Sequence, residues 1–168
     1  DSFTSVAIEH VTALGANAIG GALTAAANGT VAIGSSALGA LTSGANNTAI
    51  GYQAGDVITT SGNNTIVGKS AMGSTLATGC NYNVAIGTEA LGGSWTGSAS
   101  THNTAVGTFA MDDAMDDALR NVAMGYGSLG ALVSGNDNAA IGNDALASCT
   151  TGGTNCVLGS DAADALTT

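Results

Sequence analysis

Four aspartates fall within six residues, at Asp112, Asp113, Asp116 and Asp117. Carboxylate oxygens are ligands that Ca²⁺ prefers, so these four side chains form a weak candidate calcium site. The run lacks the alternating acidic positions and the glycine of an EF-hand loop, which favours the alternative of a solvated acidic loop.

Trp95 and His102 are the weak candidates for a binding surface. Trp95 is the only tryptophan and lies among Gly and Ser. Tryptophan is enriched at contact sites, although Trp95 could instead pack on the flank of the protein. His10 and His102 are far apart in the sequence and neither belongs to a catalytic motif.

The motifs of nucleophilic catalysis and phosphate binding are missing from the sequence. No serine lies in a Gly-x-Ser-x-Gly turn, and no Walker sequence occurs. We therefore expect neither an enzyme nor a cofactor. The three cysteines do not have metal-site spacing. Cys149 and Cys156 are close enough in sequence to pair, which would leave Cys80 over, but we favour the alternative that all three are small buried apolar residues.

Charge excludes further classes of function. The chain has 2 basic and 12 acidic residues, for a net charge of −10. A nucleic-acid surface needs clustered Lys and Arg, and an anionic membrane surface is disfavoured for the same reason. No apolar run is long enough to span a membrane. The first residues contain neither an initiator Met nor a signal peptide, which favours a processed form or an excised segment.

The elements that position these residues are copies of one phrase, Asn-Thr-Ala-Ile-Gly, as at residues 47–51. Its glycine recurs at positions 15, 34, 51, 68, 87, 107, 125, 142 and 159, with spacings of 17 to 20 residues. Such self-similarity at a short period is typical of a repeat architecture. We expect a solenoid over residues 11–163, preceded by a lead-in at 1–10 and followed by a tail at 164–168.

The four residues before each glycine predict a short strand, because they are β-branched or apolar and are bounded by Asn and Gly. The residue directly before the glycine is always large and apolar, and we expect this column to form the core: Leu14, Ile33, Ile50, Val67, Ile86, Val106, Met124, Ile141 and Leu158. The column before it is mostly Ala and points to the opposite face, where we expect close approach by another chain.

Asparagine opens the last seven copies, and stacked asparagines can form a hydrogen-bonded ladder. The ladder residues are Asn47, Asn64, Asn83, Asn103, Asn121, Asn138 and Asn155. After each glycine a second short segment begins with Ala, for which we favour a second strand over a helical turn. Nine rungs stacked at ~4.8 Å predict a rod roughly 40 Å long.

The phrase Asn-Thr-Ala-Ile-Gly-x-x-Ala-Leu, with a lead-in such as Gly62-Asn63-Asn64, resembles the head repeats of YadA-type trimeric autotransporter adhesins and the longer repeats of bacteriophage tail fibres. The resemblance covers about residues 11 to 163. It implies a left-handed parallel β-roll with three chains around one axis, in an extracellular fibre.

The fold class we predict is therefore an all-β parallel solenoid of about nine rungs. The function we predict is a structural segment of an extracellular attachment fibre on a virion or cell surface. Its partners would be other copies of the chain and a cell-surface glycan or protein receptor. The alternatives are a self-assembling filament subunit that stacks end to end and, as a minor one, an ice-binding solenoid. The longest loops, which carry Trp95 and the four aspartates, are expected to lie on one edge and to make any specific contact.

Overall fold

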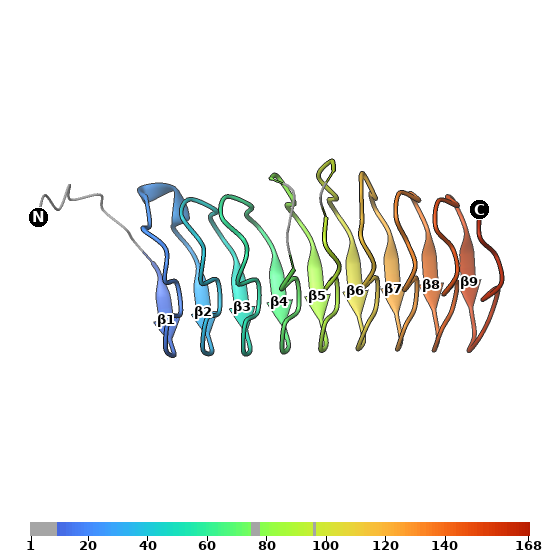
Figure 1. Cartoon of the computed structure of the whole chain (residues 1–168), viewed down its shortest axis with the longest axis horizontal. Coiled ribbons are helices and arrows are strands. Elements are labelled where there is room, and N and C mark those ends of the chain that lie inside the picture. The colour runs from blue at the N-terminus through green and yellow to red at the C-terminus, as the bar shows by residue number, and fades with distance from the viewer. Residues whose placement is uncertain (1–9, 75–77, 96) are drawn as a thin grey trace, which may run out of the picture.

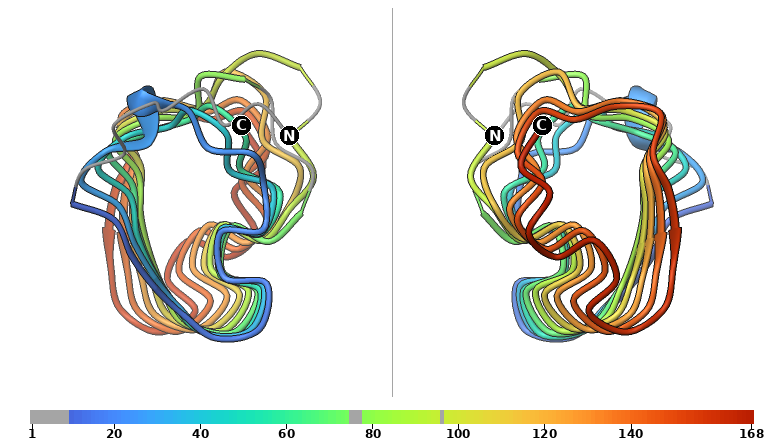
Figure 2. Two further views of the ribbon diagram at one scale, coloured as in Figure 1. Left: turned by 90° about the vertical axis from the view of Figure 1, so that its left-hand side faces the viewer. Right: turned by 90° about the vertical axis from the view of Figure 1, so that its right-hand side faces the viewer.

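A computed structural model describes residues 10–74, 78–95 and 97–168. The lead-in predicted at residues 1–10 therefore lies outside the described residues except for His10. The described chain is an all-β solenoid of nine parallel strands, one per rung, that stack along the rod (Figure 1). End-on views show the rungs following nearly the same outline with a gradual drift (Figure 2).

The strands are three residues long and pair in sequence order, each with the next, in parallel register. Their bounds are β1 (Thr12–Leu14), β2 (Val31–Ile33), β3 (Thr48–Ile50), β4 (Thr65–Val67), β5 (Val84–Ile86), β6 (Thr104–Val106), β7 (Val122–Met124), β8 (Ala139–Ile141) and β9 (Cys156–Leu158). One 3₁₀ helix, η1 (Ala25–Ala27), lies in the first rung. The strands coincide with the phrase that recurs in the sequence.

The glycine that ends each strand is required for two reasons, its positive φ and the lack of space for a side chain. Gly51 has a φ of +141°, and a Cβ placed on it would lie 2.4 Å from the carbonyl oxygen of Gly68 in the next rung. A side chain could not fit so close to a backbone atom, and only glycine adopts this φ freely. The glycine column therefore sets how closely successive rungs stack.

The prediction that the column before the glycine forms the core is wrong, because in each strand that side chain faces solvent and the Ala column faces the interior. The column directly before the glycine points out of the coil: Leu14, Ile50, Ile86, Met124, Ile141 and Leu158 are exposed, and Ile33, Val67 and Val106 are half-buried. The Ala column points inward and is wholly buried from β2 to β8, at Ala32, Ala49, Ile66, Ala85, Ala105, Ala123 and Ala140.

The physical reason is the width of the coil. In six of the rungs a larger side chain on the opposite wall points into the interior, namely Leu38, Met72, Leu91, Met111, Leu129 and Leu146. These side chains, together with loop residues such as Leu41, Ile58 and Leu132, fill the interior and leave room for little more than a methyl group on the strand. The strand's large side chains can therefore only point outward.

The segment after each glycine is a turn and not the second strand that the sequence suggested. Its backbone is left-handed at two positions per rung, as at Ser36 and Leu38 with φ of +57° and +50°. It is still stacked on its neighbours, because Leu38 donates its amide to the Ala54 carbonyl of the next rung at 2.9 Å. The tail at 164–168 continues this stacking, since the carbonyl of Asp164 accepts from the Ser148 amide.

Candidate functional site

The asparagine column forms the ladder that the sequence predicts, on the inner side of the coil. Side chains from Asn47 to Asn138 are buried, and Asn155 at the end is partly buried. The Asn138 Nδ2 donates to the Asn121 Oδ1 at 3.0 Å, and the backbone amide of Asn138 donates to the same oxygen at 3.0 Å. The Nδ2 also donates to the Gly152 carbonyl at 2.8 Å.

The ladder gives hydrogen-bond partners to buried side-chain and backbone amides, so its role is structural. The Oδ1 of one rung accepts from the next rung, as Asn103 does from the Asn121 amide and side chain at 2.9 and 3.1 Å. Buried amides cost stability only when a partner is missing. The ladder therefore fixes the register of the rungs and leaves no group facing a ligand.

The outward face of the nine-stranded sheet is a regular surface, and we call it the outer strip. It consists of the first and third residues of each strand, so that each rung contributes a pair such as Thr48 and Ile50. The first-residue column is Thr12, Val31, Thr48, Thr65, Val84, Thr104, Val122, Ala139 and Cys156, and the third-residue column is the large apolar one described above. Exposure of the third residue is 39% for Ile50, 42% for Met124 and 41% for Ile141.

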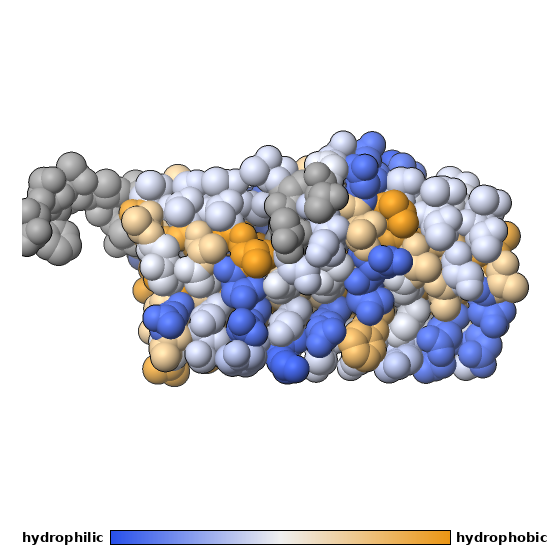
Figure 3. Space-filling model, in the orientation of Figure 1, coloured by the Kyte–Doolittle hydropathy of each residue, from blue (hydrophilic) through white to orange (hydrophobic). Residues whose placement is uncertain are grey.

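The outer strip contains no charged residue, in a chain of net charge −10. On the face that Figure 3 shows, by comparison, hydrophilic and hydrophobic residues are interspersed along the rod. A contiguous exposed apolar surface of this kind marks an interaction site in soluble proteins more often than a free surface. The structure thus points to the sheet, and not to a loop, as the candidate functional site.

A column of exposed residues flanks the strip on the side where each strand begins. Tyr82 and His102 stack there with ring centroids 4.9 Å apart and planes 17° apart. Farther along, Arg120 forms a two-pronged ion pair with Asp137, at 2.6 and 2.9 Å. This pair lowers the pKa of the Asp137 carboxyl below its usual range, chiefly through the hydrogen bond from Arg120. His102 is exposed, as a binding residue would be, and its neighbours there are Tyr82 and the Thr101 hydroxyl.

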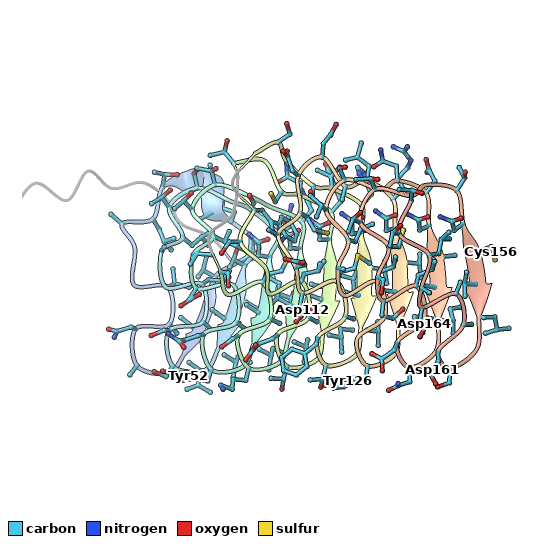
Figure 4. The ribbon with its side chains drawn as sticks, turned by 45° about the vertical axis from the view of Figure 1, so that its right-hand side comes forward. Tyr52, Asp112, Tyr126, Cys156, Asp161 and Asp164 are labelled. Atoms are coloured by element: carbon cyan, nitrogen blue, oxygen red, sulfur yellow. The ribbon has the colours of Figure 1, made fainter. Side chains whose placement is uncertain are left out.

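The other edge of the sheet, beyond the glycines, carries exposed tyrosines. Tyr52 and Tyr126 lie along the lower edge of the rod in Figure 4, and each is 53% exposed. The ring of Phe109 meets that of Tyr126 edge to face, with centroids 5.8 Å apart. The sequence analysis did not single out these aromatic residues, although Tyr52 and Tyr126 come directly after the column glycine and Phe109 comes one residue later, where the chain turns.

Trp95 is not a surface residue, which corrects the binding role predicted for it. Its side chain is wholly buried in the core, and its indole Nε1 has no hydrogen-bond partner within the described residues. The flexible glycines around it allow the loop to fold inward, and burial of a large ring is strongly favourable. The two long loops do lie side by side as predicted, since Asp116 Oδ1 accepts from the Ser98 amide.

The four aspartates of the second loop do not converge. No group of three or more His, Cys, Asp or Glu side chains in the described part of the chain is close enough to hold a metal ion, so the weak calcium site is not supported. Asp113 accepts the amide of Ala114, and Asp116 accepts that of Ser98. Asp112 borders a shallow surface hollow with Gly130 and Ala131. Its pKa is raised by burial, and further by the charges of Asp113 and Glu89.

The cysteines do not pair. Cys80 and Cys149 are buried as small apolar residues, whereas Cys156 is exposed on the outer strip in the last rung. None of the three forms a disulfide bond. Burial raises the pKa of the Cys80 thiol, so that it stays protonated.

No helix in the described residues is long and apolar enough to cross a membrane. Within those residues, the side chains that sequence analysis named are divided between the interior, which holds Trp95 and the ladder, and the surface, which holds His102 and the aspartates. Comparisons with protein-family models, with curated proteins and with solved structures find no match for this chain.

Proposed function

We propose that this chain is a rigid segment of an extracellular fibre, in which three parallel copies pack side by side through the outer strip. The observation that carries the proposal is the uninterrupted row of large apolar side chains on the solvent face of all nine strands. Isolated exposed apolar residues need no explanation, but a row along a whole sheet does.

The size of the outer strip fits a contact between copies. Nine strands at ~4.8 Å, each about 10 Å long, give a flat area of roughly 400 Å². A stable interface buries about 800 Å² per partner, so the strip would form its apolar centre and the flanking columns its rim. The exposed residues Tyr82, His102, Tyr52 and Tyr126 lie in those columns.

A second copy is a better partner for the strip than an unrelated protein. Its side chains repeat at the strand spacing, so another strip in parallel register offers the same spacing along its whole length. The absence of charge removes the local repulsion that two chains of net charge −10 otherwise feel. The number three, the extracellular location and the role in attachment come from the resemblance to trimeric adhesin and tail-fibre repeats.

Paired substitutions test the lateral contact. Ile50→Asp places a charge on the outer strip, where a single chain tolerates it because the position is 39% exposed. Its matched control, Ala49→Asp, buries a charge inside the coil and should unfold the chain. We expect the wild type to have three times the mass of one 16.0 kDa chain by light scattering, and Ile50→Asp to be a folded single chain.

A wild type that stays a single chain at every concentration would contradict the proposal, as would an Ile50→Asp variant of unchanged mass. The location and attachment role need a separate measurement. Antibodies against the chain should label fibres on the outside of intact source cells or particles. Labelling confined to the interior would show that the role in attachment is wrong even if the chains associate.

The ice-binding alternative also depends on the outer strip, because its first-residue column carries threonines. Those threonines are interrupted by Val31, Val84, Val122, Ala139 and Cys156, so the regular hydroxyl array that such a surface needs is broken. Thermal hysteresis in a dilute solution of the chain would favour this alternative over the fibre.

A further inference from the structure

Two rows of side chains border the outer strip, one along each edge. The start row lies two residues before each strand, and from β3 to β9 it consists of Asn46, Asn63, Tyr82, His102, Arg120, Asp137 and Thr154. The end row lies two residues after each strand, and over the same strands it consists of Tyr52, Lys69, Thr88, Thr108, Tyr126, Asn143 and Ser160. The start row is exposed throughout and the end row is exposed or half-buried, so a molecule that covers the strip meets both rows.

The start row is fixed in place by contacts between consecutive rungs. Its backbone is left-handed, with φ between +57° and +61° at all seven positions, so successive side chains leave the chain in the same direction. Consecutive members contact each other in pairs, namely Asn46 with Asn63, Tyr82 with His102, and Arg120 with Asp137. A row that is already ordered loses little further freedom when a neighbour binds to it.

The two edges of the strip differ in charge. In the start row from β3 to β9, the residues that are charged at neutral pH are Arg120 and Asp137, which neutralise each other in their ion pair. The end row and the residues directly after it carry one basic side chain, Lys69, and three acidic ones, Glu89, Asp144 and Asp161. The start row is therefore neutral and the end row is acidic.

The direction in which two copies pack decides which of these edges meet. The strands run across the rod, so copies related by rotation about an axis along the rod place the start row of one beside the end row of the next (Figure 1). Copies with opposite rod directions place the two end rows together. That arrangement brings the carboxylates of Glu89, Asp144 and Asp161 from two copies close to one another, and like charges that face each other are destabilising. The charge distribution therefore favours parallel copies.

An axis along the rod also decides which rungs meet. Closed rotational symmetry has no shift along its axis, so each rung lies beside the same rung of the next copy. The pairs that this brings together include Arg120 with Tyr126, Asn63 with Lys69, and Tyr82 with Glu89. All three are complementary. A guanidinium stacks on an aromatic ring while it keeps its carboxylate partner, an ammonium donates to an amide oxygen, and a phenol hydroxyl donates to a carboxylate.

We propose that the start row of each copy docks against the end row of the next copy, rung by rung, and that this seam makes the copies pack in parallel. The inference rests on the proposed lateral contact through the outer strip and names the residues that give that contact its direction. Arg120 of one copy lies over the Tyr126 ring of the next. The seam forms the polar rim around the apolar strip, as in other protein interfaces.

Cysteine cross-linking tests the seam. A chain with Asn63→Cys and Lys69→Cys carries one thiol on each edge of the same rung, and Cys156→Ser removes the exposed native thiol. A bis-maleimide cross-linker shorter than three rung spacings, roughly 14 Å, is added to the assembled protein. We expect denaturing gels to show chains linked in twos and threes, because each copy offers the thiol of one edge to the opposite edge of its neighbour.

Two further thiol pairs in the same background are the controls. Asn63→Cys with Tyr126→Cys separates the two edges by three rungs and should not link copies. Lys69→Cys with Thr108→Cys places both thiols in the end row, where opposed copies would meet, because β4 faces β6 when two nine-stranded strips overlap fully in opposite directions. Equal linking in either control overturns the seam.

Light scattering on the same samples separates the seam from the lateral contact. A wild type that stays a single chain overturns the proposed function and the seam with it. Copies that associate without linking through Asn63→Cys and Lys69→Cys overturn the seam alone.

Arg120 and Tyr126 give a second measurement that needs no thiol. They lie on opposite edges of their own strip, so coupling between them arises across two copies. Arg120→Ala and Tyr126→Ala should each raise the concentration at which the assembly dissociates roughly fivefold, and the double variant should raise it little further. Arg120→Ala combined with Asn46→Ala, in the same row but several rungs away, should multiply the two single effects. Multiplied effects for Arg120 and Tyr126 as well would overturn the proposal.

Discussion

Gly55 and Ile66 show how the coil keeps its interior filled where one rung departs from the repeat. Gly55 stands in the position that Leu38 and Met72 occupy in neighbouring rungs, and Ile66 stands in the inward Ala column. A Cβ on Gly55 would lie 2.8 Å from the Ile66 Cδ1 and 3.0 Å from the Ile58 Cδ1. The isoleucines therefore occupy the volume that the missing leucine leaves, so the two departures compensate each other.

This compensation predicts strong coupling in a double-mutant cycle. Ile66→Ala alone leaves a cavity and should cost about 2–5 kcal/mol of unfolding free energy. Gly55→Leu alone overpacks the same space and should cost about 1–3 kcal/mol. The double variant restores the usual pair of the other rungs, so its loss should be smaller than the sum by at least about 1 kcal/mol. Urea denaturation measures each value.

The control for this cycle pairs Ile66→Ala with Leu129→Ala, which lies several rungs away and should give additive losses. Additive losses for the Gly55 and Ile66 pair would contradict the compensation.

The sequence could have revealed this exchange, because one oversized and one undersized residue fall in adjacent copies. It could not show which column of the strand is inside. Alternation along a strand separates its side chains into two faces, but here both faces are apolar, so hydrophobicity does not tell which face is buried.

At the level of elements, the sequence predicted the strands, the glycine turns and the ladder, because each depends on a local rule that recurs in every copy. The second segment escaped prediction. Its Ala and Leu suit a helix or a strand, but its left-handed positions, such as Gln53 with φ of +54°, rule out both as regular structures. The burial of Trp95 was not predicted either, because nothing in the local sequence distinguishes a loop that folds inward from one that folds outward.

The loop of aspartates predicts a dependence of stability on pH. Burial, and then the charges of Asp113 and Glu89, raises the pKa of Asp112 above that of the unfolded chain. Above the raised pKa, the folded state holds an unfavourable negative charge, so this group lowers stability as pH rises through the interval between the two values. Asp112→Asn should therefore raise the melting temperature at neutral pH and make little difference at about pH 3, below the ordinary aspartate pKa.

Glu89→Gln is the companion variant for this loop. Removing the Glu89 charge should lower the pKa of Asp112, which an NMR titration of its carboxyl measures directly. If Asp112→Asn instead lowered the melting temperature at neutral pH, the ionised carboxylate would be making a favourable contact. The hydrogen bond from its own backbone amide would be the first to examine.

At the level of the whole molecule, the repeated residues determine the rod-shaped coil. The residues that differ from rung to rung have little effect on this shape. Hydrogen bonds within the coil run from each rung to the next, whereas no described residue of the chain covers the outer strip. The solenoid could therefore be predicted from the sequence, whereas the predicted packing of three copies stays a prediction. The proposed lateral contact brings together chains of net charge −10.

That charge predicts that assembly strengthens with salt. The screening length falls from ~30 Å at ~10 mM salt to ~10 Å at ~0.1 M, so repulsion between whole chains weakens while apolar and backbone contacts remain. We expect sedimentation equilibrium to show larger assemblies at ~0.5 M than at ~10 mM NaCl. Ile50→Asp should remain a single chain at both salt concentrations. Weaker assembly at high salt would instead mean that ion pairs, such as ones made by Lys69 or Arg120, hold the copies together.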